Sequence, residues 1–336
     1  MKAFEVREFG IDRLELAERP EPEPGEGEVV VRMRAWSLNF RDLLLIRGEY
    51  NPKLKRPMVP LSDGAGEVVK TGAGVTRVKT GDRVFAAFMQ KWIGGEPDEG
   101  ALRSALGGAV DGVAAEYVVF DQAGLVPIPD YLSFEEAATL PCTGVTAWHA
   151  LISEGHLRPE ETVLVQGTGG VSIFALQFAK LMKSTVIVTS SKDEKLERAR
   201  KMGADAVVNY VENPEWHKTV RDITSGRGVD QIIEVGGAGT LGKSMRAVRP
   251  GGIIHVIGVL SGRGDIDFTP VFMRNLRLQG IFVGSREMAE DMCVAMTAHE
   301  LRPVIDRVFP FGAMREALHY METGAHFGKI VVSAEH

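Results

Sequence analysis

Val163-Leu164-Val165-Gln166-Gly167-Thr168-Gly169-Gly170-Val171-Ser172 is the segment whose pattern says most about the architecture of this chain. It predicts a short β-branched strand, a glycine turn and the start of a helix. Gly167 suits the turn because glycine adopts backbone conformations that other residues avoid, while Gly169 and Gly170 have no Cβ to keep a diphosphate from the peptide N–H groups. Ser172 replaces the third glycine of the G-x-G-x-x-G pattern, so the match is imperfect. The stretch predicts a dinucleotide-binding turn over residues 167–171.

The segments around this turn alternate between strands and helices. Such alternation implies a parallel sheet with helices on both faces. We therefore predict an α/β chain with a doubly wound (Rossmann) dinucleotide-binding domain at 124–285. The predicted strands are 162–166, 184–190, 206–210, 229–235, 252–259 and 276–283, and the predicted helices between them are 171–183, 192–202, 213–224 and 238–247.

The remaining residues differ in character. Residues 1–123 contain short strand-like runs broken by Pro and Gly, and they predict a mainly β domain. Residues 286–336 predict two helices and the strand 329–333, but they are too few for a domain of their own. We expect them to return to the N-terminal part, so that 1–123 and 286–336 form one domain. The glycine-rich segment 90–112 is predicted to be a long loop without chemistry.

The kind of dinucleotide follows from the end of the second predicted strand. A fold that binds NAD has Asp or Glu about twenty residues after the glycines, against the ribose hydroxyls. Here Ser190, Ser191 and Lys192 stand at that place, with Lys195 one turn later. Hydroxyl and ammonium groups can bind a 2′-phosphate that a carboxylate would repel, so we predict NADP(H). The alternative is that residues 191–194 form only a helix capping box.

Composition limits the classes of function. A chain of 336 residues suggests two domains, and the net charge of −6, without a dominant basic cluster, argues against nucleic acid as the main partner. The longest apolar runs fall short of the roughly 18 residues that cross a membrane, and the N-terminus has no signal-peptide core, so a cytoplasmic protein is expected. Two distant cysteines, Cys142 and Cys293, provide no disulfide framework.

Several motifs carry a family resemblance. They are Leu140-Pro-Cys-Thr-Gly-Val-Thr-Ala-Trp148, Leu61-Ser-Asp-Gly-Ala-Gly66, Gly81-Asp-Arg-Val84, Asn209-Tyr210 and Phe327-Gly-Lys-Ile-Val-Val332. Together with the glycine turn they resemble the medium-chain dehydrogenase/reductase family over essentially the whole chain. The resemblance implies a GroES-like, β-rich catalytic domain beside the Rossmann domain. Within the family the chain is similar to the zinc-free branch of quinone oxidoreductases and enoyl reductases, and also to alcohol dehydrogenase-like proteins.

The resemblance also bears on zinc. The zinc alcohol dehydrogenases of the family bind catalytic zinc through a cysteine, a Gly-His-Glu segment and a second cysteine; the matching positions here hold Asn39, Ser62 with Asp63, and Cys142. An amide and a hydroxyl replace a thiolate and an imidazole poorly as zinc ligands. The family's four-cysteine lobe would fall within 90–112, which contains no cysteine. We therefore expect no metal.

By the same resemblance, four residues line the nicotinamide cleft. Tyr50 or Asn39 is expected to donate to the substrate oxygen, Asp42 to fix the loop, and Thr146 to orient the cofactor. The alternative is that Asn39 and Asp42 merely cap a short helix. Quinone reductases often have a second tyrosine two residues after the Asp, where this chain has Leu44.

Further cofactor contacts are implied at the carboxyl ends of the later strands, where ligands bind in such sheets. An ordinary turn after each strand is the alternative at every position. The implied contacts are Tyr210, Gly236, Gly258, Ser261, Val283 and Ser285.

The preferred hypothesis is a metal-independent oxidoreductase that transfers hydride from NADPH to a quinone or an activated C=C or carbonyl substrate. One alternative is an NADP-dependent alcohol dehydrogenase or carbonyl reductase without zinc. Another is a protein that binds NADPH in a structural or regulatory role. The sixth strand, Leu276 to Val283, looks like the edge through which family members form homodimers, since an exposed apolar edge would otherwise invite aggregation.

Overall fold

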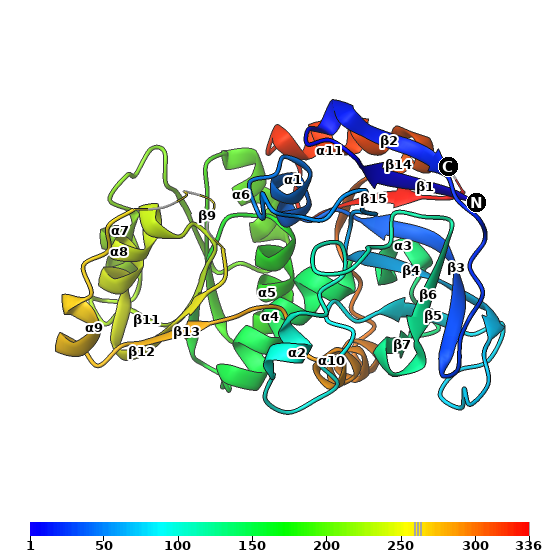
Figure 1. The fold of residues 1–336 in the computed structure, drawn as a ribbon. Coiled ribbons are helices and arrows are strands. Elements are labelled where there is room, and N and C mark those ends of the chain that lie inside the picture. Colours follow the sequence, from blue (N-terminus) through cyan, green and yellow to red (C-terminus); the bar gives the residue numbers. More distant parts are fainter. Residues whose placement is uncertain (259, 261, 263, 336) are drawn as a thin grey trace. The chain divides into compact units, whose positions relative to one another are not determined.

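The computed structural model describes residues 1–258, 260, 262 and 264–335. The chain divides into two compact units, one formed by Met1–Val145 with Val283–His336 and the other by Thr146–Phe282 (Figure 1). These bounds differ from the expected ones, because 124–145 and 283–285 group with the first unit. Within the described residues, every helix is too short or too polar to span a bilayer.

The second unit is built on a six-stranded parallel sheet. The strand order is β10-β9-β8-β11-β12-β13, which is the 3-2-1-4-5-6 order of the doubly wound fold and confirms the predicted class. Figure 1 shows α5 and α6 on one face of the sheet and α7 and α8 on the other. The strands are β8 Thr162–Gln166, β9 Thr185–Ser190, β10 Ala206–Asn209, β11 Val229–Glu234, β12 Val248–Val256 and β13 Arg277–Gly280, and the helices are α5 Gly170–Leu181, α6 Asp193–Lys201, α7 Trp216–Ile223, α8 Ala238–Ala247 and α9 Thr269–Met273.

The apolar strand runs explain this sheet. All six residues of β11 are buried, as a strand covered by helices on both faces requires. Helix α5 is also mostly buried, in keeping with the apolar run after the glycine turn. Strand β12 begins four residues earlier than predicted, and β13 is shorter than the predicted 276–283.

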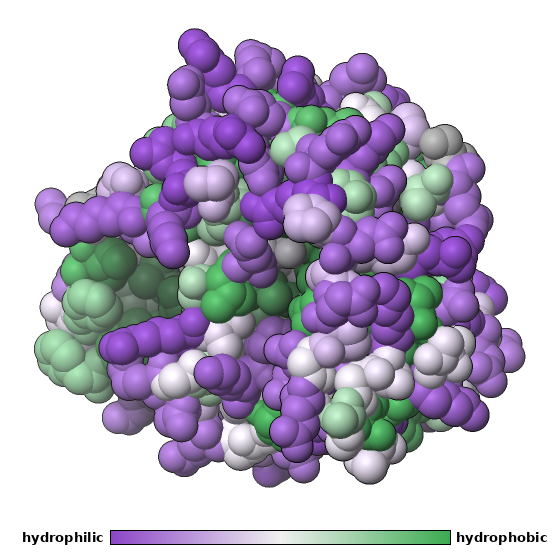
Figure 2. Space-filling view, turned by 45° about the vertical axis from the view of Figure 1, so that its right-hand side comes forward, coloured by the Kyte–Doolittle hydropathy of each residue, from purple (hydrophilic) through white to green (hydrophobic). Residues whose placement is uncertain are grey.

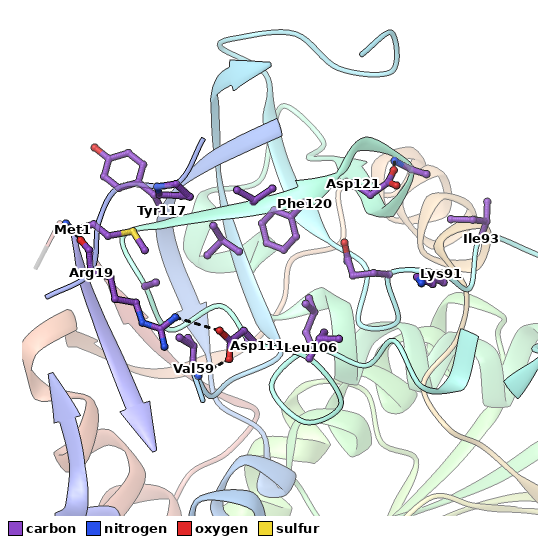
Figure 3. Close-up of a pocket in the computed structure, with 18 residues that line it drawn as sticks. Met1, Arg19, Val59, Lys91, Ile93, Leu106, Asp111, Tyr117, Phe120 and Asp121 are labelled. Carbon is purple, nitrogen blue, oxygen red and sulfur yellow. Dashed lines mark hydrogen bonds and ion pairs between the residues drawn. The ribbon is translucent and has the colours of Figure 1, made fainter. Parts of the chain in front are cut away.

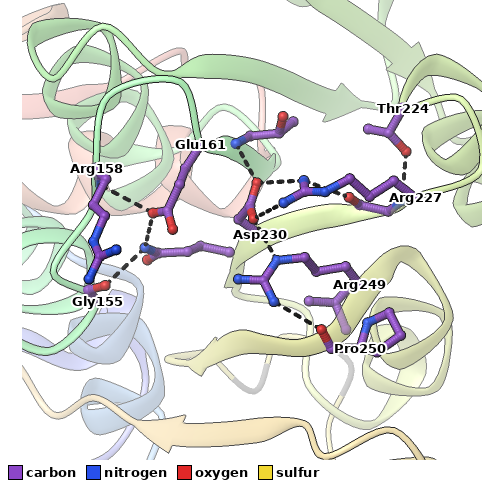
Figure 4. A network of polar contacts seen from close by, with 12 residues as sticks. Gly155, Arg158, Glu161, Thr224, Arg227, Asp230, Arg249 and Pro250 are labelled. Atoms are coloured by element: carbon purple, nitrogen blue, oxygen red, sulfur yellow. Dashed lines mark hydrogen bonds and ion pairs between the residues drawn. The ribbon is translucent and has the colours of Figure 1, made fainter.

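A charged network joins the amino ends of the central strands (Figure 4). The buried Asp230 of β11 accepts a hydrogen bond from the Thr162 N–H of β8 at 2.9 Å, two from Arg227 at 2.6 and 2.9 Å, and one from Arg249 at 2.6 Å. Burial alone would raise the pKa of Asp230, but the hydrogen bonds from Arg227, Thr162 and Arg249 lower it to about 2. The network stabilises the edge of the sheet opposite the glycine turn.

The first unit contains a seven-stranded sheet of order β14-β15-β3-β4-β5-β7, with β6 also pairing with β3, and a separate β1-β2 pair. The strands are β1 Lys2–Val6, β2 Leu14–Glu18, β3 Glu28–Ser37, β4 Asp63–Thr71, β5 Arg83–Ala86, β6 Tyr117–Asp121, β7 Leu125–Pro127, β14 Ile305–Pro310 and β15 Lys329–Ser333. The helices are α1 Phe40–Ile46, α2 Glu99–Leu102, α3 Phe134–Ala137, α10 Arg286–Ala298 and α11 Met314–Glu322.

Long-range pairing closes this sheet. Strand β15 pairs antiparallel with β3, so the C-terminal residues return to the N-terminal sheet. Strand β7 pairs with β5, which places residues after 123 in the same unit. A π-helical turn, Leu140–Gly144, leads into α4, Val145–Trp148. The predicted loop 90–112 contains the short helix α2.

Candidate active site

The glycine turn in the second unit has the geometry of an anion site. Gly167 has φ +73°, which favours glycine, and its N–H donates to the Thr189 carbonyl at 2.8 Å. A Cβ added at Gly169 would meet nothing within 4 Å, so no protein contact requires glycine there. Gly169 is the N-cap of α5 and provides no side-chain cap, which leaves the first amides of the helix for a ligand. These observations fit a dinucleotide diphosphate.

Ser172 explains the imperfect glycine pattern. Its buried hydroxyl donates to the Gln166 carbonyl at 2.7 Å, at the end of β8. A glycine would leave this carbonyl without that donor. The serine therefore stabilises the strand-to-helix turn from inside.

A buried carboxylate, which the sequence reasoning missed, organises the neighbouring strand end. Glu234 at the end of β11 accepts hydrogen bonds from the N–H groups of Gly236 at 2.9 Å and Gly237 at 3.1 Å. It also accepts from the Gln166 side chain at 2.8 Å and from the hydroxyls of Thr240 and Ser244. The network ties the carboxyl ends of β8 and β11 together where the strand order reverses, which is the usual ligand position in such sheets. The only sequence signal was a polar residue ending each apolar strand.

The corner after β9 has the predicted composition. Ser190 is buried, while Ser191 and Lys192 are exposed. The alternative capping box is wrong, because α6 begins at Asp193 with Lys192 as its N-cap and without a side-chain cap bond. The nearby Asp193 carboxylate accepts a hydrogen bond from Asn209 at 2.8 Å. Two hydroxyls and an ammonium group therefore stand where an NAD site would have a carboxylate.

The other implied cofactor residues are placed as follows. The Tyr210 N–H donates to the Ser190 carbonyl at 3.1 Å, and its side chain is exposed. The Gly258 N–H donates to the Glu234 carbonyl at 3.2 Å, beside Gly236, and Lys195 lies on α6. Ser261 lies outside the described residues.

Three implied residues fall elsewhere. Val283, with φ +55°, and Ser285 belong to the first unit, where the Ser285 hydroxyl accepts the Met288 N–H at 3.1 Å and caps α10. Thr146 is buried at the beginning of the second unit. The structure therefore brings together the residues of the glycine turn and the β9 and β11 corners.

A cluster of buried polar side chains lies in the first unit. The Asp42 carboxylate accepts the Asn39 N–H at 2.8 Å, which caps α1 as the structural alternative expected. The Asn39 amide donates to the Ser62 hydroxyl at 3.4 Å, and Ser62 donates to Asp63 at 2.7 Å. Asp63 also accepts the Cys142 N–H at 3.2 Å. Residues from the β3–α1, β4 and π-helical segments thus meet at one point.

Burial shifts the pKa values in this cluster. Burial raises the pKa of Asp42 to about 6, although Arg41 opposes the rise; nearby Asp63 adds to it. Burial likewise raises the pKa of Asp63, and the Lys329 ammonium opposes that shift. The pKa of Lys329 is lowered, again mainly by burial. Burial and Asp63 raise the pKa of the Cys142 thiol, which makes it a poor thiolate.

Tyr50 is the exposed member of the predicted set, with 46% of its surface accessible. The Arg41 guanidinium lies 5.4 Å from the centre of its ring and 4.8 Å from that of Phe88. Arg41 also donates to the Leu106 carbonyl at 3.1 Å. The tyrosine ring therefore lies beside a cation, while the residue as a whole is exposed.

A groove of 630 Å³ also opens in the first unit (Figure 3). Its walls are mainly apolar and include Val59, Leu106 and Phe120, with Arg19 and Asp111 paired at 3.2 Å. Part of the wall comes from the predicted loop 90–112. None of the predicted site residues lines it, so we assign it no part in the reaction.

Several known proteins that resemble this chain are described as alcohol dehydrogenases or as domains of such enzymes. Residues 25–130 match the family described as alcohol dehydrogenase GroES-like domain, and residues 170–298 match that described as zinc-binding dehydrogenase. A zinc-type alcohol dehydrogenase-like protein of Schizosaccharomyces pombe is 43% identical over 97% of this chain and 96% of its own.

Two solved structures are similarly close. A putative alcohol dehydrogenase from Sinorhizobium meliloti 1021 has a TM-score of 0.92 and 43% identity, covering 99% of this chain and 98% of its own. A structure described as NAD-dependent alcohol dehydrogenase has a TM-score of 0.91 and 36% identity, covering 99% and 100%. These likenesses extend over both units.

The zinc named in two of these descriptions does not fit the side chains of this chain. The matching positions hold an amide, a hydroxyl beside a carboxylate, and one thiol, at Asn39, Ser62, Asp63 and Cys142. Zinc in catalytic sites is held by three side chains of the His, Cys, Asp and Glu type. In the part of the chain that the structure describes, three or more such side chains nowhere gather in a group that could hold a metal ion.

Proposed function

Since this chain belongs to the medium-chain dehydrogenase/reductase family, as an alcohol dehydrogenase-like oxidoreductase, we propose that it transfers hydride from NADPH to a quinone or an activated C=C or carbonyl group without a metal ion. The observation that carries this proposal is the replacement of zinc ligands by Asn39 and Ser62. Without a Lewis acid, an acceptor that is already electron-poor is reduced more readily than a simple ketone.

The chain's own residues would then supply the proton and hold the reacting groups. NADPH, when bound, supplies the hydride, and one further proton completes the reduction. Tyr50 is the better donor of the two proposed, because the residue is exposed whereas both polar atoms of the Asn39 amide have protein partners. Asp42 fixes α1 through the Asn39 N–H. Thr146 is proposed to orient the nicotinamide.

The preference for NADPH rests on charge. Ser190, Ser191 and Lys192 offer hydroxyl and ammonium groups to a 2′-phosphate. The NAD-dependent relative makes NADH the competing cofactor. Titration calorimetry with both nucleotides tests the choice: we expect NADPH to bind at least about tenfold more tightly, and tighter NADH binding would refute it.

A substrate panel tests the reaction. The purified protein would be assayed with quinones, enones, aldehydes and alcohols, before and after treatment with a chelator, together with its zinc content. We expect turnover of quinones or enones that survives chelation. Turnover of alcohols or aldehydes alone would support the second candidate, a carbonyl reductase, which the names of the relatives favour. Tight NADPH binding without turnover would indicate a structural or regulatory protein.

We also propose a homodimer formed through β13, with the cytoplasm as its location. Among the residues that the structure describes, β13 pairs only with β12 and is the last strand of the sheet. Large exposed apolar residues occur near it, at Phe268, Phe272, Met273 and Phe282. Exposed apolar residues of this size would be a liability for a monomer. Figure 2 shows apolar residues in several areas of the face in view, among largely polar surface. A monomer by light scattering at micromolar concentration would refute the dimer.

A further inference from the structure

A buried lysine lies at the centre of the polar cluster. Lys329, the first residue of β15, has a side chain that is 3% exposed. Its ammonium group donates to the Asn39 amide oxygen at 2.6 Å and to the Leu38 carbonyl at 2.7 Å. It also lies 4.0 Å from the Asp63 carboxylate. Burying an ammonium group costs several kcal/mol unless the group is paired and hydrogen-bonded, so the partners of Lys329 must offset that cost.

The contacts close into a ring of four side chains. Lys329 binds the oxygen of the Asn39 amide, and the nitrogen of that amide donates to Ser62 at 3.4 Å. Ser62 donates to one oxygen of Asp63 at 2.7 Å, and the other oxygen faces the ammonium group. The ring therefore joins one basic and one acidic side chain, and each member orients the next.

By the family resemblance, the ring includes residues at positions that hold zinc ligands in the zinc dehydrogenases. Asn39 and Ser62 stand at two of those positions, and the N–H of Cys142, the third, binds Asp63 at 3.2 Å. The Asn39 oxygen is already bound to the ammonium group. A divalent ion placed beside Asp63 would be repelled by a like charge, because the Lys329 ammonium group lies 4.0 Å from that carboxylate.

We propose that the Lys329 ammonium group is the resident cation of this cluster, in the place that zinc occupies in the zinc dehydrogenases of the family. It neutralises Asp63 and holds the oxygen of the Asn39 amide, which turns the amide nitrogen toward Ser62. The inference rests on the metal independence proposed above, and it adds the residue that makes a metal unnecessary for charge balance.

A double-mutant cycle on the full chain tests the charge pair. Thermal unfolding would be compared for wild type, Lys329→Met, Asp63→Asn and the double variant. Lys329→Met leaves a buried carboxylate without its cation, so we expect Tm to fall by roughly 10 °C. The double variant removes both charges and should recover at least about half of that loss, because the uncompensated charge is gone.

Two control variants test whether the effect on Tm is specific to the buried charge. Lys70 pairs with Glu23 at 2.7 Å on the surface, so Lys70→Met should lower Tm by less than about 2 °C. Lys329→Gln keeps a hydrogen-bond donor but not the charge, and we expect it to behave like Lys329→Met. If Lys329→Met does not fold, the cycle is run with Lys329→Gln instead.

The metal is measured in the same samples. We expect less than about 0.1 zinc per wild-type chain and no change of Tm on adding a chelator. Additive effects of Lys329→Met and Asp63→Asn would overturn the inference, as would one bound zinc per chain that is lost in Asp63→Asn. If the Tm effects of Lys329→Met and Asp63→Asn are coupled but the protein turns over no substrate, only the proposed function is refuted. If the two Tm effects are additive in an active, zinc-free enzyme, only this inference is refuted.

Discussion

Asp42→Asn should stabilise the first unit at neutral and alkaline pH. The Asp42 side chain is fully buried, and its Oδ1 has no hydrogen-bond partner among the described residues. Its pKa rises from the ordinary 3.8 to about 6. Each pKa unit is worth about 1.4 kcal/mol, so ionising this group in the folded chain costs about 3 kcal/mol more than in the unfolded chain. An asparagine keeps an oxygen for the Asn39 N–H but carries no charge.

The sign of the pH dependence follows from the raised pKa. The folded chain holds the proton more tightly than the unfolded chain, so the stability contributed by Asp42 is full below about pH 4 and is lost as the pH rises through 6. The variant and the wild type should therefore be equally stable near pH 4. At pH 8 the variant should unfold roughly 6 to 12 °C higher, as about 3 kcal/mol implies for a unit of this size.

The assay is scanning calorimetry of both proteins at pH 4, 6 and 8, followed at the transition of the first unit. Asp291→Asn is the matched control, because Asp291 is exposed on the same unit, and we expect its difference from wild type to be the same at each pH. A difference between Asp42→Asn and wild type that does not grow with pH would refute the reasoning. So would a variant that is less stable at pH 8.

Three further predictions concern the second unit. Ser191→Asp puts a carboxylate where the 2′-phosphate is proposed to bind, so NADPH affinity should fall at least about tenfold and NADH affinity much less, by calorimetry; equal losses would contradict the NADP proposal. Gly169→Ala adds a methyl group into open space, so Tm should change by no more than about 2 °C while nucleotide affinity falls at least about tenfold; unchanged affinity would exclude a diphosphate at this turn. Asp230, with its pKa lowered to about 2, contributes stability above pH 4 that is lost as the pH falls toward 2, so Asp230→Asn should cost about 2 kcal/mol at pH 7 and little near pH 2 in urea unfolding. A cost that persists near pH 2 would point to packing instead of charge.

The sequence predicted the second unit well because its signals are local. β8 and α8 were predicted to the residue, and the ends of the other predicted helices and strands of this unit lie within four residues of the prediction, whereas α9 was not predicted. The domain bounds could not be predicted from local sequence, because β7 joins the first unit through hydrogen bonds to β5, some forty residues away. Nothing in the local pattern of residues 125–127 identifies that partner.

The candidate site shows the same division. The glycine turn and the corner after β9, residues 190–192, are each continuous in sequence, so the sequence indicated them directly. Glu234 was missed, because a glutamate ending a strand is ordinary until its five hydrogen-bond donors are seen around it. Lys329 was quoted within a motif, but its role was not inferred. A charged residue just before the apolar run Ile330–Val332 was the one available signal.

The amino-acid sequence alone was enough to predict the doubly wound unit and to propose a phosphate-binding turn within it, because hydrophobic period and glycine position are properties of short segments. The composition of the buried polar cluster follows only from the tertiary structure. Lys329 and Asn39 are 290 residues apart, and an ammonium group meets that amide only because β15 pairs with β3 and carries the lysine into the cluster. Charge compensation in a buried site depends on distances in space, which the order of residues does not state.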